Sequence, residues 1–200
     1  MKFLELSSKK LNRDLEEIFN DMENTNYRPE LVIFLGKGGL YIGEFFSNKF
    51  NCRMEEILVQ RQEPSLKKIV KPLLSYLPKY LLKFMRNFEI NSNYHVKNEN
   101  RIVNFNMDKN HLKDYSKILL VDDSIDSGFS MDIAKKKISE LNNNAEIKIA
   151  ALNIFDTSKS VIDTDFYLYN NTALMGPWSL DSEEYKMFLL DYKRWKGESK

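Results

Sequence analysis

The sequence is poor in the residues from which disulfide frameworks and soft-metal sites are built. Cys52 is the only cysteine, and the 200 residues include only two histidines, His95 and His111. A single cysteine excludes a disulfide scaffold and a thiolate metal cluster, and it favours a cytoplasmic protein. Two separated histidines in a polar region are too few for a metal centre of their own.

Long apolar runs and an excess of one charge are also missing. Residues 1–5 lack the apolar run of a signal peptide, and no stretch reaches the roughly 20 apolar residues of a transmembrane helix. We therefore expect no membrane segment. The formal net charge of +1 gives no reason to expect a nucleic-acid partner. With 42% hydrophobic residues, the chain can bury one core, which predicts a single domain.

Short apolar segments alternate with amphipathic ones along most of the chain. Apolar runs predict strands, and apolar residues at helical spacing predict helices. This alternation favours an α/β fold in which helices flank a parallel twisted sheet. The expected strands are residues 31–35, 56–60, 117–121, 147–155 and 166–169, and the expected helices are residues 8–24, 40–50, 129–141 and a last one after Ser182.

Residues 63–88 depart from this alternation. They combine lysines with leucines and are interrupted by Pro64, Pro72 and Pro78, so two or three short helices are expected. This basic amphipathic element suits an acidic partner, a membrane surface or an anionic substrate, and equally a packing element with a solvated face. Residues 91–110 are polar and predict a β-ribbon or a mobile loop.

Residues 117–130 carry the strongest functional signal. An apolar strand ends in Asp122 and Asp123, and a loop rich in Ser, Asp and Gly then leads into a helix near Phe129. Open α/β sheets bind ligands at the carboxyl ends of their strands, and a helix N-terminus attracts anions. The paired acids suit vicinal hydroxyls and the loop suits a phosphate, as in a ribose 5-phosphate. Taken alone, the pair also fits a metal site or a receiver-domain pocket.

A second loop, Gly36-Lys37-Gly38-Gly39, lies between an apolar strand and a helix. This arrangement binds anions, with Lys37 as a cation on a backbone that a ligand can approach closely. The Walker spacing is missing, and Tyr41 stands where a dinucleotide fingerprint needs glycine. A tight turn with a solvated lysine is the alternative interpretation.

Together these segments resemble the type I phosphoribosyltransferase family. Residues 121–130, Val-Asp-Asp-Ser-Ile-Asp-Ser-Gly-Phe-Ser, are similar to its loop for 5-phosphoribosyl pyrophosphate (PRPP), with two serines in place of threonines. Residues 35–40, Leu-Gly-Lys-Gly-Gly-Leu, resemble its pyrophosphate loop, with Lys37 where arginine is common. Residues 176–178, Gly-Pro-Trp, resemble the hood of xanthine and xanthine-guanine members.

The resemblance implies one phosphoribosyltransferase-like domain over residues 1–200. Its sheet core would comprise about residues 28–60 and 94–170. A hood subdomain with the atypical insertion would comprise about residues 61–93 and 171–200.

The resemblance also implies a role for each loop residue. Asp122 and Asp123 would accept hydrogen bonds from the ribose hydroxyls, and Lys37 would stabilise the leaving pyrophosphate as a catalytic residue. Asp126 matches the general base of hypoxanthine-type members, or it caps a turn. The 5-phosphate would be bound by Ser124, Ile125, Asp126, Ser127, Gly128, Phe129 and Ser130. The pyrophosphate would be bound by Gly36, Lys37, Gly38 and Gly39.

The acceptor site is where the sequence leaves the family pattern. Purine-using members carry a lysine near the end of the strand that follows the PRPP helix. Here the nearest alignment places Asp156 at that position, with Lys159 a few residues on. Trp178 would stack on a base, or it would pin the hood. Asp156, Lys159 and Trp178 are therefore the candidates for acceptor binding.

The expected activity is transfer of the phosphoribosyl group from PRPP to a nucleobase-like nitrogen, with release of pyrophosphate, as in nucleotide salvage. The resemblance implies Mg²⁺ as cofactor, carried by PRPP near Asp122 and Asp123 without dedicated protein ligands. The expected partners are PRPP, a small-molecule acceptor and a second copy in a homodimer. Two alternatives stay open: a non-catalytic PRPP or nucleotide sensor, and a tailoring enzyme with a non-purine acceptor. The presence of both Asp126 and Lys37 favours an enzyme.

Overall fold

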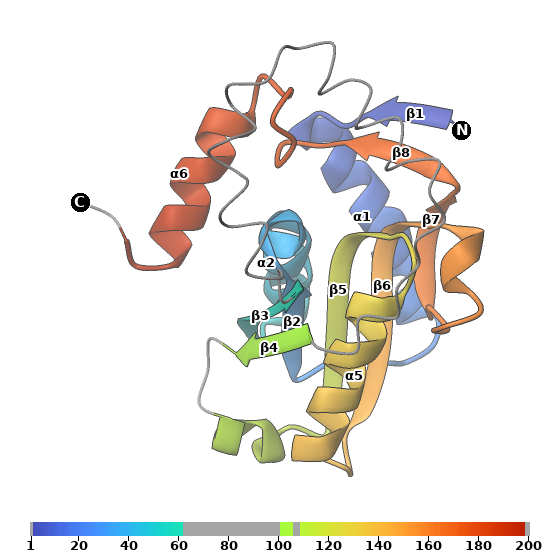
Figure 1. The fold of residues 1–200 in the computed structure, drawn as a ribbon, viewed down its shortest axis with the longest axis vertical. Coiled ribbons are helices and arrows are strands. Elements are labelled where there is room, and N and C mark those ends of the chain that lie inside the picture. The colour runs from blue at the N-terminus through green and yellow to red at the C-terminus, as the bar shows by residue number, and fades with distance from the viewer. Residues whose placement is uncertain (1, 62–100, 106–108, 199–200) are drawn as a thin grey trace, which may run out of the picture. The chain divides into compact units, whose positions relative to one another are not determined.

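The computed structural model describes residues 2–61, 101–105 and 109–198 (Figure 1). By its internal contacts the chain divides into one unit of residues 1–59 with 103–200 and a second unit of residues 60–102. The Lys/Leu-rich insertion at residues 63–88 and most of the predicted ribbon lie outside the described residues. The first unit holds both candidate loops and most of the sheet.

A six-stranded sheet forms the centre of the first unit. β2 pairs in parallel with both β3 and β5, and β6 pairs in parallel with both β5 and β7. The predicted α/β fold with a parallel sheet is thus confirmed. The strand order is β4 (Arg101–Phe105), β3 (Arg53–Arg61), β2 (Leu31–Leu35), β5 (Lys117–Ile125), β6 (Glu146–Ile154) and β7 (Phe166–Asn170).

Each face of the sheet has its own apolar core, because side chains alternate along the strands. Phe34 and Val121 belong to a core with α1 (Ser8–Glu23), α2 (Leu40–Phe50) and α6 (Tyr185–Trp195). Ile33 and Leu120 belong to the opposite core with α5 (Phe129–Leu141). The central strands are therefore apolar on both sides, which explains their uninterrupted hydrophobic runs.

A smaller parallel sheet joins the two ends of the chain. β1 (Lys2–Glu5) pairs with β8 (Thr172–Met175), with Leu4 opposite Leu174, and the two strands run side by side near the N-terminus in Figure 1. The sequence predicted neither strand. Each has only four residues, too few for a periodic pattern, and each is stabilised by the other.

Strand β5 is longer than the sequence predicts. The loop was expected to begin at Ser124, but the strand continues to Ile125 because Ser124 and Ile125 still pair with Asn153 and Ile154 of β6. The acidic pair therefore lies inside a paired strand, and its backbone is fixed on one side. Among the described residues, no helix combines the length and the apolarity needed to cross a lipid bilayer.

Candidate active site

The two candidate loops adjoin, because they follow neighbouring strands. β2 leads into residues 36–39, the glycine loop, and β5 leads into residues 122–130, the acidic loop. In the pairing of the two strands, Phe34 lies opposite Val121. A Cβ atom on Gly38 would lie 2.6 Å from Oδ1 of Asp123, so a side chain at this position would displace the carboxylate. Gly36 has φ +54° and ψ −169°, a conformation reserved for glycine. The chain turns in opposite directions from β2 and β5, which is where open α/β sheets form ligand crevices.

The surroundings of the acidic pair, Asp122 and Asp123, disfavour the ionised form of both carboxyl groups. The backbone N–H of Asp123 donates to Oδ1 of Asp122 at 2.9 Å. Burial, followed by the neighbouring carboxylate of Asp123, raises the pKa of Asp122 well above its usual value. Burial also raises the pKa of Asp123. Among the described residues, no lysine or arginine pairs with either side chain. The pair is thus suited to a ligand that brings hydroxyl protons or a cation.

The loop from Ser124 to the start of α5 is held in place by a buried amide. Nδ2 of Asn153, which is fully buried, donates to Oγ of Ser124 at 3.1 Å, and its Oδ1 accepts from the backbone N–H of Thr172 at 3.0 Å. Gly128 has φ +79° and lies against Ser158, so that α5 begins at Phe129 with its N-terminus toward the loop. The helix dipole there favours an anion. Sequence reasoning missed Asn153, because a buried asparagine in a strand has no motif.

Lys37 lies against the last helix. Its Nζ is 5.3 Å from the centre of the Tyr192 ring, within the range of a cation–π contact. The Tyr192 hydroxyl donates to Oε1 of Glu56 at 2.5 Å, and Glu56, which is fully buried, also pairs with Lys196. α6 thereby connects the glycine loop to the neighbouring strand β3. The sequence predicted the helix but not this role.

Trp178 contacts the acidic pair through its indole. The side chain of Asp122 and then the indole of Trp178 lower the pKa of Asp123 against the larger effect of burial. The ring covers Gly176, where a Cβ atom would lie 2.6 Å from the indole carbons. The segment after β8 is thus fastened to the end of β5. In this arrangement the indole orients Asp123, while the ring packs on its own chain.

Asp156 and Lys159 pair with each other outside the pocket. Lys159 Nζ lies 2.7 Å from Oδ1 of Asp156, and Asn171 Nδ2 donates to Oδ2 at 2.6 Å. The hydrogen bond from Lys159, supported by Asn171 and Asn170, lowers the pKa of Asp156 to about 2. Both charged side chains are exposed, and the structure does not bring them to the acidic pair.

A pocket of about 510 Å³ opens beside the acidic pair. It receives side chains from the acidic loop, from the segment after β6 and from β8. Its position next to Asp123 and Asp126 makes it a candidate pocket for a small ligand. The lining residues are Asp123, Ser124, Asp126, Phe155, Thr157, Ala173 and Leu174.

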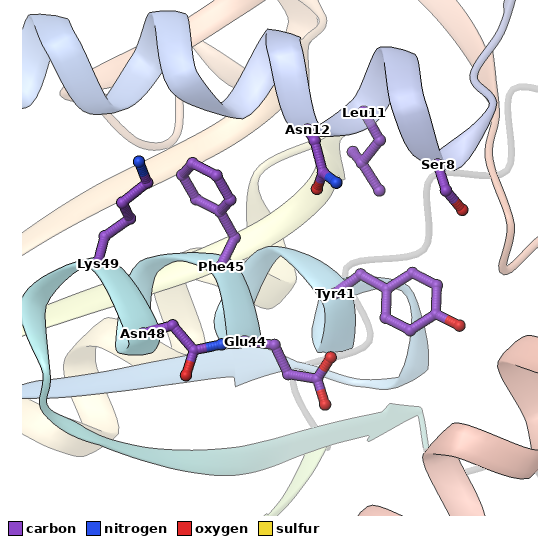
Figure 2. Close-up of a pocket in the computed structure, with 8 residues that line it drawn as sticks. All are labelled: Ser8, Leu11, Asn12, Tyr41, Glu44, Phe45, Asn48 and Lys49. Carbon is purple, nitrogen blue, oxygen red and sulfur yellow. The ribbon is translucent and has the colours of Figure 1, made fainter.

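A second pocket, of about 440 Å³, lies between α1 and α2 (Figure 2). Lys49 sits at this pocket and pairs with Glu16 at 2.6 Å. None of the lining residues belongs to the glycine loop or the acidic loop. We therefore place the candidate active site at the first pocket. The second is lined by Ser8, Leu11, Asn12, Tyr41, Glu44, Phe45, Asn48 and Lys49.

The parallel sheet with two ligand loops at its carboxyl edge defines a type I phosphoribosyltransferase architecture. A family model for the phosphoribosyl transferase domain matches residues 5–172, and the chain belongs to that family. The resemblance seen in the sequence is thereby confirmed.

Solved structures share this fold. A xanthine-guanine-hypoxanthine phosphoribosyltransferase from Helicobacter pylori has a TM-score of 0.65 at 18% identity, covering 92% of this chain and 99% of that one. A purine phosphoribosyltransferase from Pyrococcus horikoshii has a TM-score of 0.62 at 16% identity, covering 91% of this chain and 97% of that one. A hypothetical protein from Neisseria gonorrhoeae with bound ppGpp has a TM-score of 0.59 at 12% identity, covering 96% of this chain and 97% of that one. No curated protein sequence matches the chain.

Proposed function

We propose that this protein transfers the 5-phosphoribosyl group of PRPP to a ring nitrogen of a small heterocyclic acceptor. The observation that carries the proposal is the contact between Gly38 and Asp123, with the pocket beside Asp123. One loop is suited to pyrophosphate and the other to a ribose 5-phosphate. The pocket is suited to the acceptor.

The reaction is a displacement at the anomeric carbon of the ribose. The bond from this carbon to the pyrophosphate oxygen breaks, and its electron pair leaves with pyrophosphate. Lys37 and the N–H groups of the glycine loop would stabilise that charge. The acceptor nitrogen forms the new bond and loses a proton. Asp126 lines the pocket, and its carboxylate would take this proton.

The acidic pair would orient the sugar. Ionised Asp122 and Asp123 accept hydrogen bonds, which matches the two ribose hydroxyls. Two uncompensated carboxylates are also hard oxygen ligands, so the same residues would hold Mg²⁺ arriving with PRPP, and the ion would supply charge neutralisation at the pyrophosphate. The indole of Trp178 lowers the pKa of Asp123, which favours the ionised carboxylate that accepts these hydrogen bonds.

The direct test is pyrophosphate release from Mg-PRPP in the presence of a panel of purines, pyrimidines and simple amines. We expect release with at least one acceptor, and loss of both PRPP binding and release in the double variant Asp122→Asn, Asp123→Asn. Asp163→Asn, an exposed acid outside the site, is the matched control. If calorimetry shows that the double variant binds PRPP as tightly as the parent, the proposal is wrong.

A second candidate is a nucleotide sensor of the same fold. The Neisseria structure, whose fold matches over nearly the whole chain, holds ppGpp, which carries phosphates on a ribose. In a sensor, the glycine loop and the acidic loop would bind the ligand and Asp126 would take no proton. Tight binding of PRPP or ppGpp without pyrophosphate release by any acceptor in the panel would favour this function.

A further inference from the structure

We propose that Tyr192 is a positioning residue for Lys37, and that its ring holds the lysine ammonium group ready for the pyrophosphate. The inference rests on the proposed function, which assigns pyrophosphate to the glycine loop. It adds a residue from α6, a helix that contributes to neither loop. The observation that carries it is the distance of 5.3 Å between Nζ of Lys37 and the centre of the Tyr192 ring.

Lys37 needs a partner to hold its side chain in one place. It lies between Gly36 and Gly38, so neither neighbour along the chain has a side chain that could pack against it. A lysine stem has many rotamers, and a ligand that must fix a free side chain binds less tightly. An ammonium group over an aromatic face is attracted by the charge distribution of the ring. The ring of Tyr192 can therefore fix Lys37 before a ligand binds.

The contact with Tyr192 leaves the charge of Lys37 available to an anion. Among the described residues, no carboxylate pairs with this ammonium group. A ring face attracts a cation but carries no net charge, so it does not neutralise the lysine as an aspartate or a glutamate would. The N–H donors of the ammonium group can still turn toward the oxygens of pyrophosphate. Tyr192 is thus suited to hold a lysine that must bind an anion.

Tyr192 is itself held from two sides. Within α6, its ring lies between those of Phe188 and Trp195, and each of these ring centres is 6.4 Å away. Outside the helix, its hydroxyl donates to Oε1 of Glu56 in β3 at 2.5 Å, and Tyr192 is buried. These contacts leave the ring one position, and this position determines where the ammonium group of Lys37 lies.

The carboxylate of Glu56 strengthens the attraction between the ring and Lys37. A phenol that donates to a carboxylate gains electron density, because the groups of a hydrogen-bond network polarise one another. A ring with more electron density attracts a cation more strongly. Nζ of Lys196 lies 5.7 Å from the same ring centre, but this lysine pairs with Glu56. Of the two described lysines at the ring, only Lys37 therefore keeps its charge for a ligand.

The test measures the affinity for Mg-pyrophosphate by calorimetry in variants of Tyr192. Tyr192→Leu removes the ring face, and we expect the affinity to fall by about threefold to tenfold. Tyr192→Phe keeps the face, and we expect a loss of less than about twofold. Ribose 5-phosphate, which carries no pyrophosphate, should bind equally well to the parent and to both variants. An equal loss in the two variants, or a parallel loss of affinity for ribose 5-phosphate, would overturn the inference.

Tyr185→Leu is the matched control. Tyr185 lies in the same helix and stacks on Phe188 with 6.4 Å between the ring centres, but no described lysine lies over its ring. We expect its loss to leave the affinity for Mg-pyrophosphate unchanged.

A change of the ring alone keeps the test decisive if Tyr192→Leu does not fold. Tyr192→Phe is made with a trifluorinated ring, which keeps nearly the same shape but withdraws electrons from the ring face. This protein should bind Mg-pyrophosphate less tightly than Tyr192→Phe with a plain ring. Equal affinities of the two proteins would contradict the inference.

A double-mutant cycle shows whether Tyr192 acts through Lys37. In the background of Lys37→Met, Tyr192→Leu should change the affinity for Mg-pyrophosphate by less than about twofold, because the ring then has no cation to hold. If Tyr192→Leu causes the same loss with and without Lys37, Tyr192 is not a positioning residue for this lysine.

The titrations use pyrophosphate itself, so their result does not depend on turnover. If no acceptor releases pyrophosphate from PRPP but the variants lose affinity in the expected order, the transferase proposal alone fails. If the parent turns over and Tyr192→Leu binds Mg-pyrophosphate as tightly as the parent, the inference about Tyr192 alone fails. A parent that does not bind Mg-pyrophosphate also overturns this inference.

Discussion

The side of the site that would hold the donor differs from the side that would hold the acceptor in how it is built. The donor side, residues 36–39 with 122–130, consists of backbone loops at the ends of two adjacent strands. The acceptor side, Phe155, Thr157, Ala173 and Leu174, comes from two segments whose pairing partners lie far away in sequence. A backbone site needs particular residues at fixed spacing, whereas a side-chain site needs only compatible shapes. The first leaves a motif in the sequence and the second does not.

The strongest test of the donor side is Gly38→Ala. The added Cβ atom would meet the Asp123 carboxylate at 2.6 Å, which forces the carboxylate out of its position beside the glycine loop. We expect PRPP affinity to fall by at least about a hundredfold, the scale of losing a main electrostatic contact, with binding measured by calorimetry. Gly197→Ala adds backbone strain at φ +72° without a contact to its Cβ atom, and should leave the affinity unchanged. Equal affinity in both variants would refute the contact.

The support beneath the donor side is tested with Lys196→Met. Removing the lysine leaves the carboxylate of Glu56 fully buried with only the Tyr192 hydroxyl. An uncompensated buried charge destabilises a protein by about 3 kcal/mol, which urea unfolding would detect. Lys193→Met, exposed on the same helix, is the control. If both variants unfold at the same urea concentration as the parent, the ion pair does not hold α6.

The link between the two sides is tested with Trp178→Phe. Loss of the indole donor raises the pKa of Asp123, because that hydrogen bond favours the ionised carboxylate. PRPP binding needs ionised acids, so affinity falls as the pH drops through this pKa. In the variant this fall begins at a higher pH, and we expect an affinity loss of about tenfold in the acid limb, with little change at alkaline pH. Identical pH profiles would show that the indole does not act on Asp123.

The raised pKa values of Asp122 and Asp123 also contribute to the pH dependence of the stability of the free protein. A carboxyl whose pKa is higher in the folded state than in the unfolded state favours folding while it is protonated. That contribution is present at low pH and is lost as the pH rises from the unfolded pKa through the folded one. Asp122→Asn should therefore unfold at a higher temperature than the parent at pH 8, by a few degrees, while it binds PRPP less well. A lower melting temperature would contradict the raised pKa.

The smallest effect is expected from Lys159→Ala. The ion pair with Asp156 is exposed, and exposed pairs contribute less than about 1 kcal/mol. Because Lys159 lies outside the acceptor pocket, kcat/KM for each purine should change less than about twofold. A selective loss with oxo-purines would show that Lys159 reaches the acceptor, and would remove the contrast between the two sides.

The sequence predicted the fold and the position of the two loops after their strands because both depend on local patterns. Buried strands such as residues 31–35 and the helix at residues 129–141 have clear periodicity, and the two loops have fixed spacing. Asn153, which fixes the acidic loop, and Tyr192, which lies over Lys37, act through contacts between distant segments. A single sequence contains no signal for such pairings. For the same reason, the comparison with the family pattern indicated Asp156 as a candidate for acceptor binding, whereas its neighbours Phe155 and Thr157 line the pocket.

The pairing of β1 with β8 has a consequence for how the protein is made. Leu4 lies opposite Leu174, so β1 leaves the ribosome long before β8, the strand with which it pairs, has been synthesised. Contacts between such distant segments form late, because closing the long loop costs entropy. Strands β2, β5 and β6, with both donor loops, can assemble earlier. In a nascent chain, the two loops of the proposed donor side should thus form before β8 completes the pocket beside Asp123.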